Sequence, residues 1–350
     1  MEVRYIEDDG VWNYTLRRSR QTQLLQSWEW GVFQQTIQRP AHRLQVVEDE
    51  MVLAALQCFE HQLPTGKRYL YAPRGPVFFT DDTLLFDSIV HNLTCELTQL
   101  AKRRGAVFVR LEPSGTAQLE LSLFAPLSYR KALSVQPENE LFVLTDKEED
   151  VLLSTMHEKT RYNVRLAMKR GVRPRLIETV SYAHRAFPSF WQLLQGTAKR
   201  QGIITHERSY YERMVDVLMP KGMIKLLVAE SDNEIIAANL LGVFGDTVTY
   251  LHGASSFEHR SLMAPYLLHW EAMRYAKEWS CQYYNLGGVS PEGEPEHRWA
   301  SLTHFKEWFV TLGNTGERVR YLGALDLVTR PLWYRMYGTV RSARRLFRRY

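Results

Sequence analysis

The sequence predicts an α/β protein made of two units, each with a mixed sheet, because one order of elements occurs twice along its 350 residues. In each half, two apolar strand-like runs are followed by a helical pattern and a further strand. The length is sufficient for two domains. Hydrophobic residues make up 45% of the chain and charged residues 24%, which is typical of a globular protein and excludes a disordered one.

In the first half, the continuous apolar runs 51–59 and 69–78 predict two strands. A helix is expected over about 84–104, and the stretch 106–113 is expected to be the strand that completes the unit. The apolar residues of the predicted helix keep near-helical spacing: Leu85, Ile89, Leu93, Leu97 and Leu100.

The second half repeats this order. Strands are expected over 234–244 and 247–255, joined as a hairpin across Gly245-Asp246. A helix is expected over 262–279, followed by a strand over 281–288 that ends in glycines. A duplicated strand–strand–helix–strand unit with a mixed sheet in each half is therefore the predicted architecture.

The connection 137–172 joins the two halves. Thr145 is expected to cap a helix that carries acidic residues in its first turn. We expect one unit to comprise 1–144 plus 317–350, with a basic C-terminal helix packing back onto it. The second unit is expected to comprise 145–316.

The positive charge of the chain is concentrated at its C-terminal end. Net charge is +5, but the last 21 residues carry seven arginines and no acid, so the remainder is near −2 (5 − 7). Apolar residues recur there at helical spacing: Leu332, Met336, Val340, Ala343 and Phe347. Such a helix can rest on an anionic membrane or on RNA, or it can pack its apolar stripe on the protein and expose a basic face to water.

Cysteine use and apolar run lengths indicate the compartment. The three cysteines, Cys58, Cys95 and Cys281, form no Cys-x-x-Cys pair, which argues against a disulfide framework and a cysteine zinc site. The N-terminus is acidic and lacks the apolar core of a signal peptide, and the longest apolar run, 235–245, is too short to cross a bilayer. We expect a cytoplasmic protein.

The duplicated unit resembles the core of the GCN5-related acetyltransferase (GNAT) fold. Enzymes of that fold hold the pyrophosphate of coenzyme A on backbone N–H groups of a glycine-containing loop at a helix start. Arg260 suits the first position of such a loop, but Met263 and Pro265 stand where glycine and a small residue belong. The chain also contains no Walker loop, no Gly-x-Gly-x-x-Gly and no His-Glu-x-x-His, so we expect neither a cofactor nor a metal.

Six segments, in their order along the chain, resemble the Fem family (FemABX). They are 24–34, 69–78, 107–113, 159–172, 284–288 and 304–309. The resemblance extends from about residue 20 to residue 340. It implies two acetyltransferase-like subdomains and a peptidyltransferase that builds peptidoglycan cross-bridges. Some members carry a helical arm in the second subdomain, but 172–234 is too short for one, so the chain resembles the armless type.

The reaction implied by this resemblance is transfer of an amino acid from aminoacyl-tRNA to an amine on the stem peptide of a peptidoglycan precursor. The precursor is either UDP-N-acetylmuramoyl pentapeptide or its lipid-linked form, lipid II. Moving an acyl group from an ester to an amine runs downhill, so neither ATP nor a metal is required. None of the cysteines lies in an activating setting, so direct attack by the amine is expected.

Lys306 and Phe305 match a Phe-Lys pair that lies near the acyl-transfer centre in the family. An ammonium in a partly dry site stabilises the oxyanion of the tetrahedral intermediate, or a tRNA phosphate, far better than in water. The flanking aromatic residues can exclude water and stack on the terminal adenine of tRNA. The alternative is a lysine whose stem covers apolar surface while its head reaches water.

Contacts to tRNA are predicted on the segment 159–172. Arg161, Arg165 and Lys169 are spaced four residues apart and are expected to share one helix face, with Lys159 at its start. Such a stripe suits phosphates, which give affinity without base readout. The alternative is a solvated charged face.

Precursor binding is predicted at several positions. Trp30 lies in the tryptophan-glycine segment of the family, and Gln34 or Gln35 stands where a phosphate-binding lysine is expected, which puts the UDP-diphosphate contact in doubt. Arg200 and Arg208 are both candidates for the phosphate contact of the second subdomain.

Three further residues are predicted to contribute to the acceptor side. Glu112 replaces an aspartate of the family and can orient the attacking amine, or make a turn or ion pair. Tyr250 and His252 are expected on one side of a strand near the peptide stem, where His252 can act as a base or be a structural group.

The function predicted is therefore an aminoacyltransferase whose partners are aminoacyl-tRNA and a peptidoglycan precursor, with peripheral contact to the inner membrane surface. Two alternatives stay open. One is an acyl-CoA-dependent N-acyltransferase, against which the altered pyrophosphate loop weighs. The other is a non-enzymatic adaptor that binds RNA or a membrane surface through the arginine-rich tail.

Overall fold

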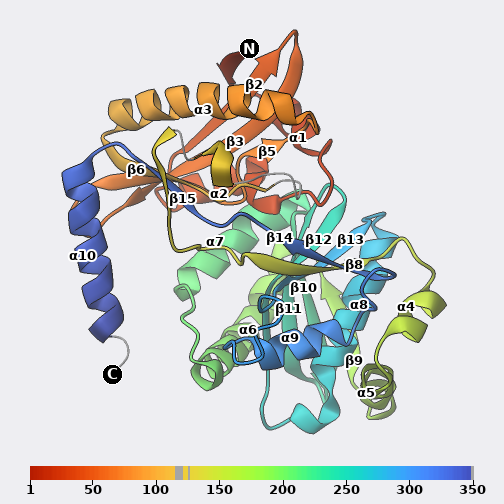
Figure 1. Cartoon of the computed structure of the whole chain (residues 1–350). Helices are drawn as coiled ribbons and strands as arrows, with labels where there is room; N and C mark the ends of the chain where they lie inside the picture. Colours follow the sequence, from red (N-terminus) through yellow and green to blue (C-terminus); the bar gives the residue numbers. More distant parts are fainter. Residues whose placement is uncertain (115–120, 125–126, 348–350) are drawn as a thin grey trace. The chain divides into compact units, whose positions relative to one another are not determined.

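The computed structural model describes residues 1–114, 121–124 and 127–347, and the chain divides into two compact units (Figure 1). The first unit is made of Met1–Ser19, Gln38–Glu138 and Tyr321–Tyr350. The second unit is made of Arg20–Ile37 and Asn139–Arg320. Each unit has its own mixed sheet and its own hydrophobic core.

The sheet of the first unit has the strand order β1-β2-β3-β4-β6-β15-β7, with β5 paired to β3. Its strands are β1 (Glu2–Tyr5), β2 (Ala41–Glu48), β3 (Met51–Gln62), β4 (Arg68–Ala72), β5 (Val77–Phe78), β6 (Ala106–Leu111), β7 (Tyr129–Lys131) and β15 (Leu325–Val328). Helix α3 (Thr83–Arg104) packs on this sheet. The carboxylate of Asp82 caps its start and Gly105, at φ 66°, ends it.

The sheet of the second unit has the strand order β14-β8-β13-β12-β11-β10-β9. Its strands are β8 (Asn139–Leu144), β9 (Arg173–Ile177), β10 (Ile224–Ser231), β11 (Glu234–Phe244), β12 (Thr247–Ser255), β13 (Tyr283–Gly288) and β14 (Gly316–Arg320). Its main helices are α2 (Trp28–Thr36), α4 (Glu149–Thr155), α5 (Glu158–Lys169), α6 (Val180–Gln201), α7 (Arg208–Leu218), α8 (Ala264–Glu278) and α9 (Ala300–Glu307).

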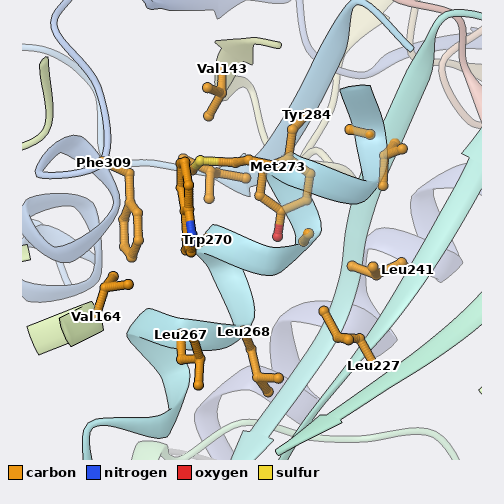
Figure 2. Packing of buried hydrophobic residues seen from close by; sticks show 14 of the residues in the cluster. Val143, Val164, Leu227, Leu241, Leu267, Leu268, Trp270, Met273, Tyr284 and Phe309 are labelled. Carbon is orange, nitrogen blue, oxygen red and sulfur yellow. The ribbon is translucent and has the colours of Figure 1, made fainter. Parts of the chain in front are cut away.

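The core that positions the candidate site lies under α8. Figure 2 shows Leu267, Leu268, Trp270 and Met273 of α8 in one cluster with residues of the sheet, such as Leu241. Helix α8 packs on α5 through the same cluster. Burial of this much apolar surface, at about 25 cal/mol per Å², fixes α8 and the neighbouring start of β13 relative to the sheet.

The predicted duplication is confirmed by the topology. In the first unit β2, β3 and β4 are antiparallel neighbours and β6, which follows α3, pairs parallel with β4. In the second unit β10, β11 and β12 are antiparallel neighbours and β13, which follows α8, pairs parallel with β12. The predicted α/β class with two mixed sheets is therefore correct, and β11 and β12 have the predicted bounds.

The structure differs from the predicted bounds in three places. Strand β8, residues 20–37 and residues 317–320 lie in the second unit and not in the first as predicted. Strand β8 pairs there with β13 and with β14, which contains 317–320. The predicted strand 69–78 is interrupted between β4 and β5, where Arg74 adopts φ 54°. Thr145 caps no helix, since its hydroxyl donates to the carbonyl of Cys281 and α4 begins after Glu148.

No extended helical arm lies between β9 and β10, a part of the chain that the structure describes completely. This stretch forms α6 and α7, which are joined by residues 202–207 and pack on each other and on the sheet. Hydrogen bonds at the end of α6 support this short connection, since Gly202 adopts φ 62° and the N–H of Ile203 donates to the carbonyl of Ala198. The armless type is the one observed.

The C-terminal helix α10 (Pro331–Phe347) packs through a different face from the one predicted. Trp333, Tyr334 and Tyr337 contact the cluster around Val107 and Phe108, whereas Leu332 and Met336 of the predicted stripe are exposed. Val340, Ala343 and Phe347 lie outside the side chains that the structure describes. Every helix among the described residues is too short or too polar to span a bilayer.

Candidate functional site

Lys306 is buried in the second unit, on the last turn of α9, with only 4% of its surface exposed. Its ammonium donates a hydrogen bond to the carbonyl of Gly288, at 2.7 Å, and lies 6.0 Å from the ring centre of Tyr250. Burial lowers the pKa of Lys306 to about 8, while the nearby carboxylate of Glu140 acts in the opposite direction. The head group is therefore not solvated, which excludes the alternative of a lysine that reaches bulk water.

The glycine turn that receives this ammonium is held by a buried polar network. The side-chain oxygen of Asn285 accepts from the N–H of Gly287, at 2.7 Å, and its amide nitrogen donates to Glu140, at 2.8 Å. Gly287 adopts φ 79°, and a Cβ there would lie 3.7 Å from the nitrogen of Lys306. Glycine is favoured at this position because side chains rarely adopt a positive φ.

Aromatic rings surround the site on the side of α8. Phe305 contacts Tyr266 and His269, with ring centres 5.0 and 5.5 Å apart. The ring nitrogen Nδ1 of His269 is hydrogen-bonded to the hydroxyl of Tyr284, at 2.8 Å. Burial, helped by the charge of Lys306, lowers the pKa of His269 to about 3, so this imidazole is neutral at physiological pH.

Sequence analysis did not identify Glu140, Asn285 or His269. The glycines that end the strand 281–288 were noted, but their partner Glu140 lies 145 residues from Asn285 along the chain. His269 stands inside an apolar helical pattern, which favours a structural interpretation. The pairing of β8 with β13 brings Glu140 beside Asn285, and the packing of α8 on the same core places His269 near Phe305.

A cavity of about 740 Å³ opens beside α9 within the second unit. Its walls include Tyr266, Phe305 and Trp308, together with the loop that carries Glu292 and Glu294. A cavity of this size and aromatic lining suits an organic ligand rather than a single ion. Phe305 lines the cavity, whereas the side chain of Lys306, the next residue of α9, turns to Gly288 and Tyr250.

The start of α5 lies against Trp308, on the wall of this cavity. The ring of His157 stacks on Trp308 with centres 4.5 Å apart, and the ammonium of Lys159 lies 5.7 Å from the centre of the Trp308 ring. Further along α5, Arg165 and Lys169 are exposed, with no ion-pair partner among the described residues. These cations and the aromatic ring give a basic surface that leads to the cavity.

Arg161 does not share the exposed face predicted for α5. Its guanidinium turns to the end of α4, where it donates to the carbonyls of Ser154, at 3.0 Å, and Met156. Both carbonyls belong to the last turn of α4 or follow it, so the cation satisfies acceptors that lack helical partners. The predicted stripe of three cations is therefore wrong at Arg161.

Tyr250 and His252 point to opposite faces of the sheet, contrary to the prediction. Leu240 pairs with His252 and Leu241 with Tyr250, so Leu251 is an extra residue that forms a β-bulge. Tyr250 contacts His269 of α8, whereas His252 contacts Tyr211 of α7. Only Tyr250 thus lies near Lys306. Burial lowers the pKa of His252 to about 4, which makes it a weak base.

Trp30 and Gln34 are buried in α2, which packs on α7. The ring of Trp30 contacts Phe33, and Phe33 contacts Tyr210 of α7, with ring centres 5.2 and 5.1 Å apart. Trp30 and Gln34 therefore lie near α7, as His252 does, and not beside Lys306.

Arg200 and Arg208 both have partners in the second unit. Arg200 donates to the carbonyl of Ser255, at 2.7 Å, and its guanidinium lies 5.8 Å from the ring centre of Phe257. Arg208 pairs with Glu212 one turn along α7, at 2.8 Å, and both side chains are partly exposed. An exposed pair of this kind is weak and can yield to a phosphate, so the geometry does not decide between the two arginines.

Glu112 is buried in the first unit. Its carboxylate accepts hydrogen bonds from the hydroxyl of Tyr71 and from the N–H groups of Val135 and Gln136. Burial raises the pKa of Glu112, against the lowering effect of these donors. In this structure the carboxylate anchors the chain that leads to β8.

The start of α8 lacks the features of a pyrophosphate-binding loop. Met263 caps the helix at φ 57°, and Pro265 removes one of the N–H groups that a phosphate would use. A pyrophosphate at this helix start would therefore lack one of the backbone donors that a glycine-containing loop provides.

Comparison with known proteins gives relatives over nearly the whole chain. The lipid II:glycine glycyltransferase of Staphylococcus saprophyticus is 22% identical, with 92% of this chain and 92% of that protein covered. The lipid II:glycine glycyltransferase of Staphylococcus aureus strain USA300 is 23% identical, with 91% of each covered.

Solved structures give the same fold. The crystal structure of FemX matches with a TM-score of 0.79 and 20% identity, covering 96% of this chain and all of that chain. A tandem GNAT protein from the clavulanic acid biosynthesis pathway matches with a TM-score of 0.51 and 13% identity, covering 83% of each. A sequence model of the FemAB family matches residues 9–123, 127–234 and 221–342, and the chain therefore belongs to the FemAB family.

Proposed function

We propose that this protein is an aminoacyltransferase that moves an amino acid from aminoacyl-tRNA to the stem-peptide amine of a lipid-linked peptidoglycan precursor. The observation that carries the proposal is the buried ammonium of Lys306, which is fixed at a glycine turn on the same helix whose Phe305 and His304 line a cavity. The named activity of the staphylococcal relatives, which act on lipid II, supports the lipid-linked acceptor over the soluble one.

The chemistry is aminolysis of an ester. The deprotonated stem amine attacks the ester carbonyl and forms a new C–N bond, and the carbonyl oxygen becomes an oxyanion. When the intermediate collapses, the C–O bond to the tRNA ribose breaks, and the proton released by the amine is taken up by the departing oxygen, directly or through water. Lys306 donates to the oxyanion, an interaction that typically contributes 10²–10³ in rate, roughly 2.7–4 kcal/mol.

The acyl donor is proposed to approach along α5. Lys159, Arg165 and Lys169 would contact backbone phosphates near the 3′ end of the tRNA, and the cavity walled by Phe305 and Trp308 would take a terminal base by stacking. The carboxylates of Glu292 and Glu294 border the same cavity and repel phosphate. The phosphate backbone of the tRNA would therefore run from the cavity past Lys159 and not past the loop that carries Glu292 and Glu294.

The acceptor is proposed to use groups on both faces of the second sheet. Tyr250 lies near Lys306 and would contact the end of the stem peptide that carries the amine. Trp30, Gln34 and His252 would contact more distant parts, and either Arg200 or Arg208 would contact phosphate. Because Glu112 is already bonded by three donors, we assign it the support of residues 135–136 rather than the attacking amine.

A transfer assay tests this function. The protein is incubated with charged total tRNA and, separately, with lipid II and with UDP-N-acetylmuramoyl pentapeptide, and each precursor is weighed by mass spectrometry. We expect an added amino-acid mass on lipid II that disappears when the tRNA is deacylated. Absence of any added mass on both precursors, together with tight coenzyme A binding by calorimetry, would favour the acyl-CoA-dependent N-acyltransferase.

A further inference from the structure

The orientation of α10 on the first unit is fixed by one aromatic face. Trp333, Tyr334 and Tyr337 pack on β6 and on the turn after β3. The hydroxyl of Tyr334 donates to the buried carboxylate of Asp326, at 2.8 Å, and the ammonium of Lys67 lies 4.7 Å from the centre of the Trp333 ring. Rotation of α10 would break these contacts. The helix is therefore held with the opposite face, which includes Leu332 and Met336, exposed to solvent.

The outer face of α10, which we define by Leu332 and Met336, carries exposed apolar side chains one helical turn apart. Leu332 is 75% exposed and Met336 is 51% exposed. Arg335, between them, is exposed, as is Arg330 just before the helix. The last 21 residues of the sequence contain five further arginines and no acid. A partner that covers this face must therefore have both an apolar surface for Leu332 and Met336 and negative charge for the arginines.

We propose that the outer face of α10 docks on an anionic phospholipid bilayer. Leu332 and Met336 would enter the boundary between headgroups and acyl chains, where their apolar surface is removed from water. Arg330 and Arg335 would meet lipid phosphates, since a negatively charged bilayer surface attracts basic side chains. Neither contact alters the aromatic face, so the helix can bind without leaving the sheet.

Other occupants match only half of this surface. An RNA would neutralise the arginines but leave Leu332 and Met336 in water. A second copy of the chain would cover the apolar residues but bring two arginine-rich helices together, and like charges at close range repel. The bilayer alone supplies both an apolar layer and negative charge.

The docking itself does not depend on the proposed function, but its benefit to the enzyme rests on it, since a lipid-linked acceptor presents its stem peptide at the bilayer surface. Docking through α10 would confine the enzyme to the layer that holds its acceptor and so raise the effective concentration of that acceptor. The soluble precursor gains nothing from this effect.

The inference is tested with the full chain and with vesicles that contain neither tRNA nor precursor, so the result is independent of the proposed function. Co-sedimentation is measured with vesicles of phosphatidylglycerol and phosphatidylcholine, and with phosphatidylcholine alone. We expect binding to the anionic vesicles only, weaker at high salt, and at least tenfold weaker in Leu332→Gln/Met336→Gln. Leu84→Gln, at a leucine of α3 that is 86% exposed, is the matched control and should bind as the wild type does.

Three results would overturn the inference: no binding of the wild type to anionic vesicles, equal binding of the double variant, or a double variant that loses tRNA affinity while keeping vesicle affinity. Circular dichroism and the melting temperature establish that the double variant is folded. If vesicle binding behaves as expected but no precursor gains mass in the transfer assay, the docking surface stands and the proposed function fails.

Discussion

The ammonium nitrogen of Lys306 lies 2.7 Å from the carbonyl oxygen of Gly288, and this contact joins α9 to the end of β13. A backbone carbonyl is a neutral partner and leaves the positive charge uncompensated, unlike a carboxylate in direct contact. Glu140, whose charge acts on the pKa of Lys306, accepts its hydrogen bond from Asn285 instead. The ammonium of Lys306 can therefore stabilise a negative charge that forms on a bound substrate, such as the oxyanion of a tetrahedral intermediate.

Holding this cation costs stability, so we predict that Lys306→Met does not lower the melting temperature at pH 7. The pKa of Lys306 falls from 10.5 to about 8, which corresponds to roughly 3 kcal/mol. Below pH 8 both states are protonated and the full cost is present. Between pH 8 and 10.5 the folded lysine loses its proton first, the unfolded state binds more protons, and the wild type gains stability relative to the variant.

Thermal melts of both proteins from pH 6.5 to 10 measure this difference. The variant should have its greatest relative stability at and below pH 8 and should lose this advantage as the pH rises to 10. A variant that is less stable by several degrees at every pH would instead indicate that Lys306 is mainly a structural residue.

Removal of the acid near Lys306 should shift the pH dependence of transfer. Glu140 opposes the lowering of the Lys306 pKa, so Glu140→Gln should move the alkaline limb of the pH–rate profile to lower pH. The amide keeps an acceptor oxygen for Asn285 and so preserves much of the turn. Glu278→Gln, at an exposed position of α8, is the control. An alkaline limb that stays in place would disconnect Glu140 from the lysine.

Alanine variants at two glycines of the second unit that share a backbone conformation can distinguish the effect of backbone strain from a role in transfer. Gly287 has φ 79° and Gly171, at the end of α5, has φ 80°. Alanine at either position should cost about 1–2 kcal/mol of stability because the left-handed region disfavours a Cβ. Only Gly287→Ala places that Cβ 3.7 Å from the Lys306 nitrogen. Transfer at saturating substrates should fall in Gly287→Ala alone, and equal activity of the two variants would argue against the glycine turn as part of the site.

The cations of α5 should determine the salt dependence of tRNA binding. Arg165→Ala/Lys169→Ala should reduce the slope of log affinity against log salt by roughly 0.7–0.9 for each phosphate that the variant no longer neutralises. Arg161→Ala should instead lower the melting temperature, because it removes donors from the end of α4. Arg213→Ala/Lys221→Ala removes two exposed cations elsewhere in the second unit and is the matched control. An unchanged slope in Arg165→Ala/Lys169→Ala would show that these residues of α5 do not contact tRNA phosphates.

Periodicity predicted the elements well where one face is apolar. The bounds of β11 and β12 follow from continuous apolar runs around a Gly-Asp turn, and α3 follows from the near-helical spacing of its apolar residues. Lys306 was identified from its aromatic neighbours and from the family resemblance. The division into units was less accurate, because β8 joins the second unit by strand pairing and residues 20–37 join it by helix packing, both with partners distant in sequence.

The remaining differences come from contacts that periodicity does not encode. A bulged residue, Leu251, reverses the alternation on which the pairing of Tyr250 with His252 depended. On α10 the aliphatic stripe has the more regular spacing, yet the aromatic face is the one that packs, because rings such as Trp333 bury more surface. Arg161 has the right spacing for an exposed stripe but reaches acceptors at the end of a neighbouring helix.

The role proposed for the charge of Lys306 is to stabilise the transition state of aminoacyl transfer. Its most direct test is the single-turnover rate of transfer from charged tRNA to lipid II, at saturating acceptor, for the wild type and Lys306→Met at pH 7. We expect the rate to fall by about 10²–10³ in the variant, with unchanged tRNA affinity and no loss of thermal stability. A rate within a few-fold of the wild type would contradict it.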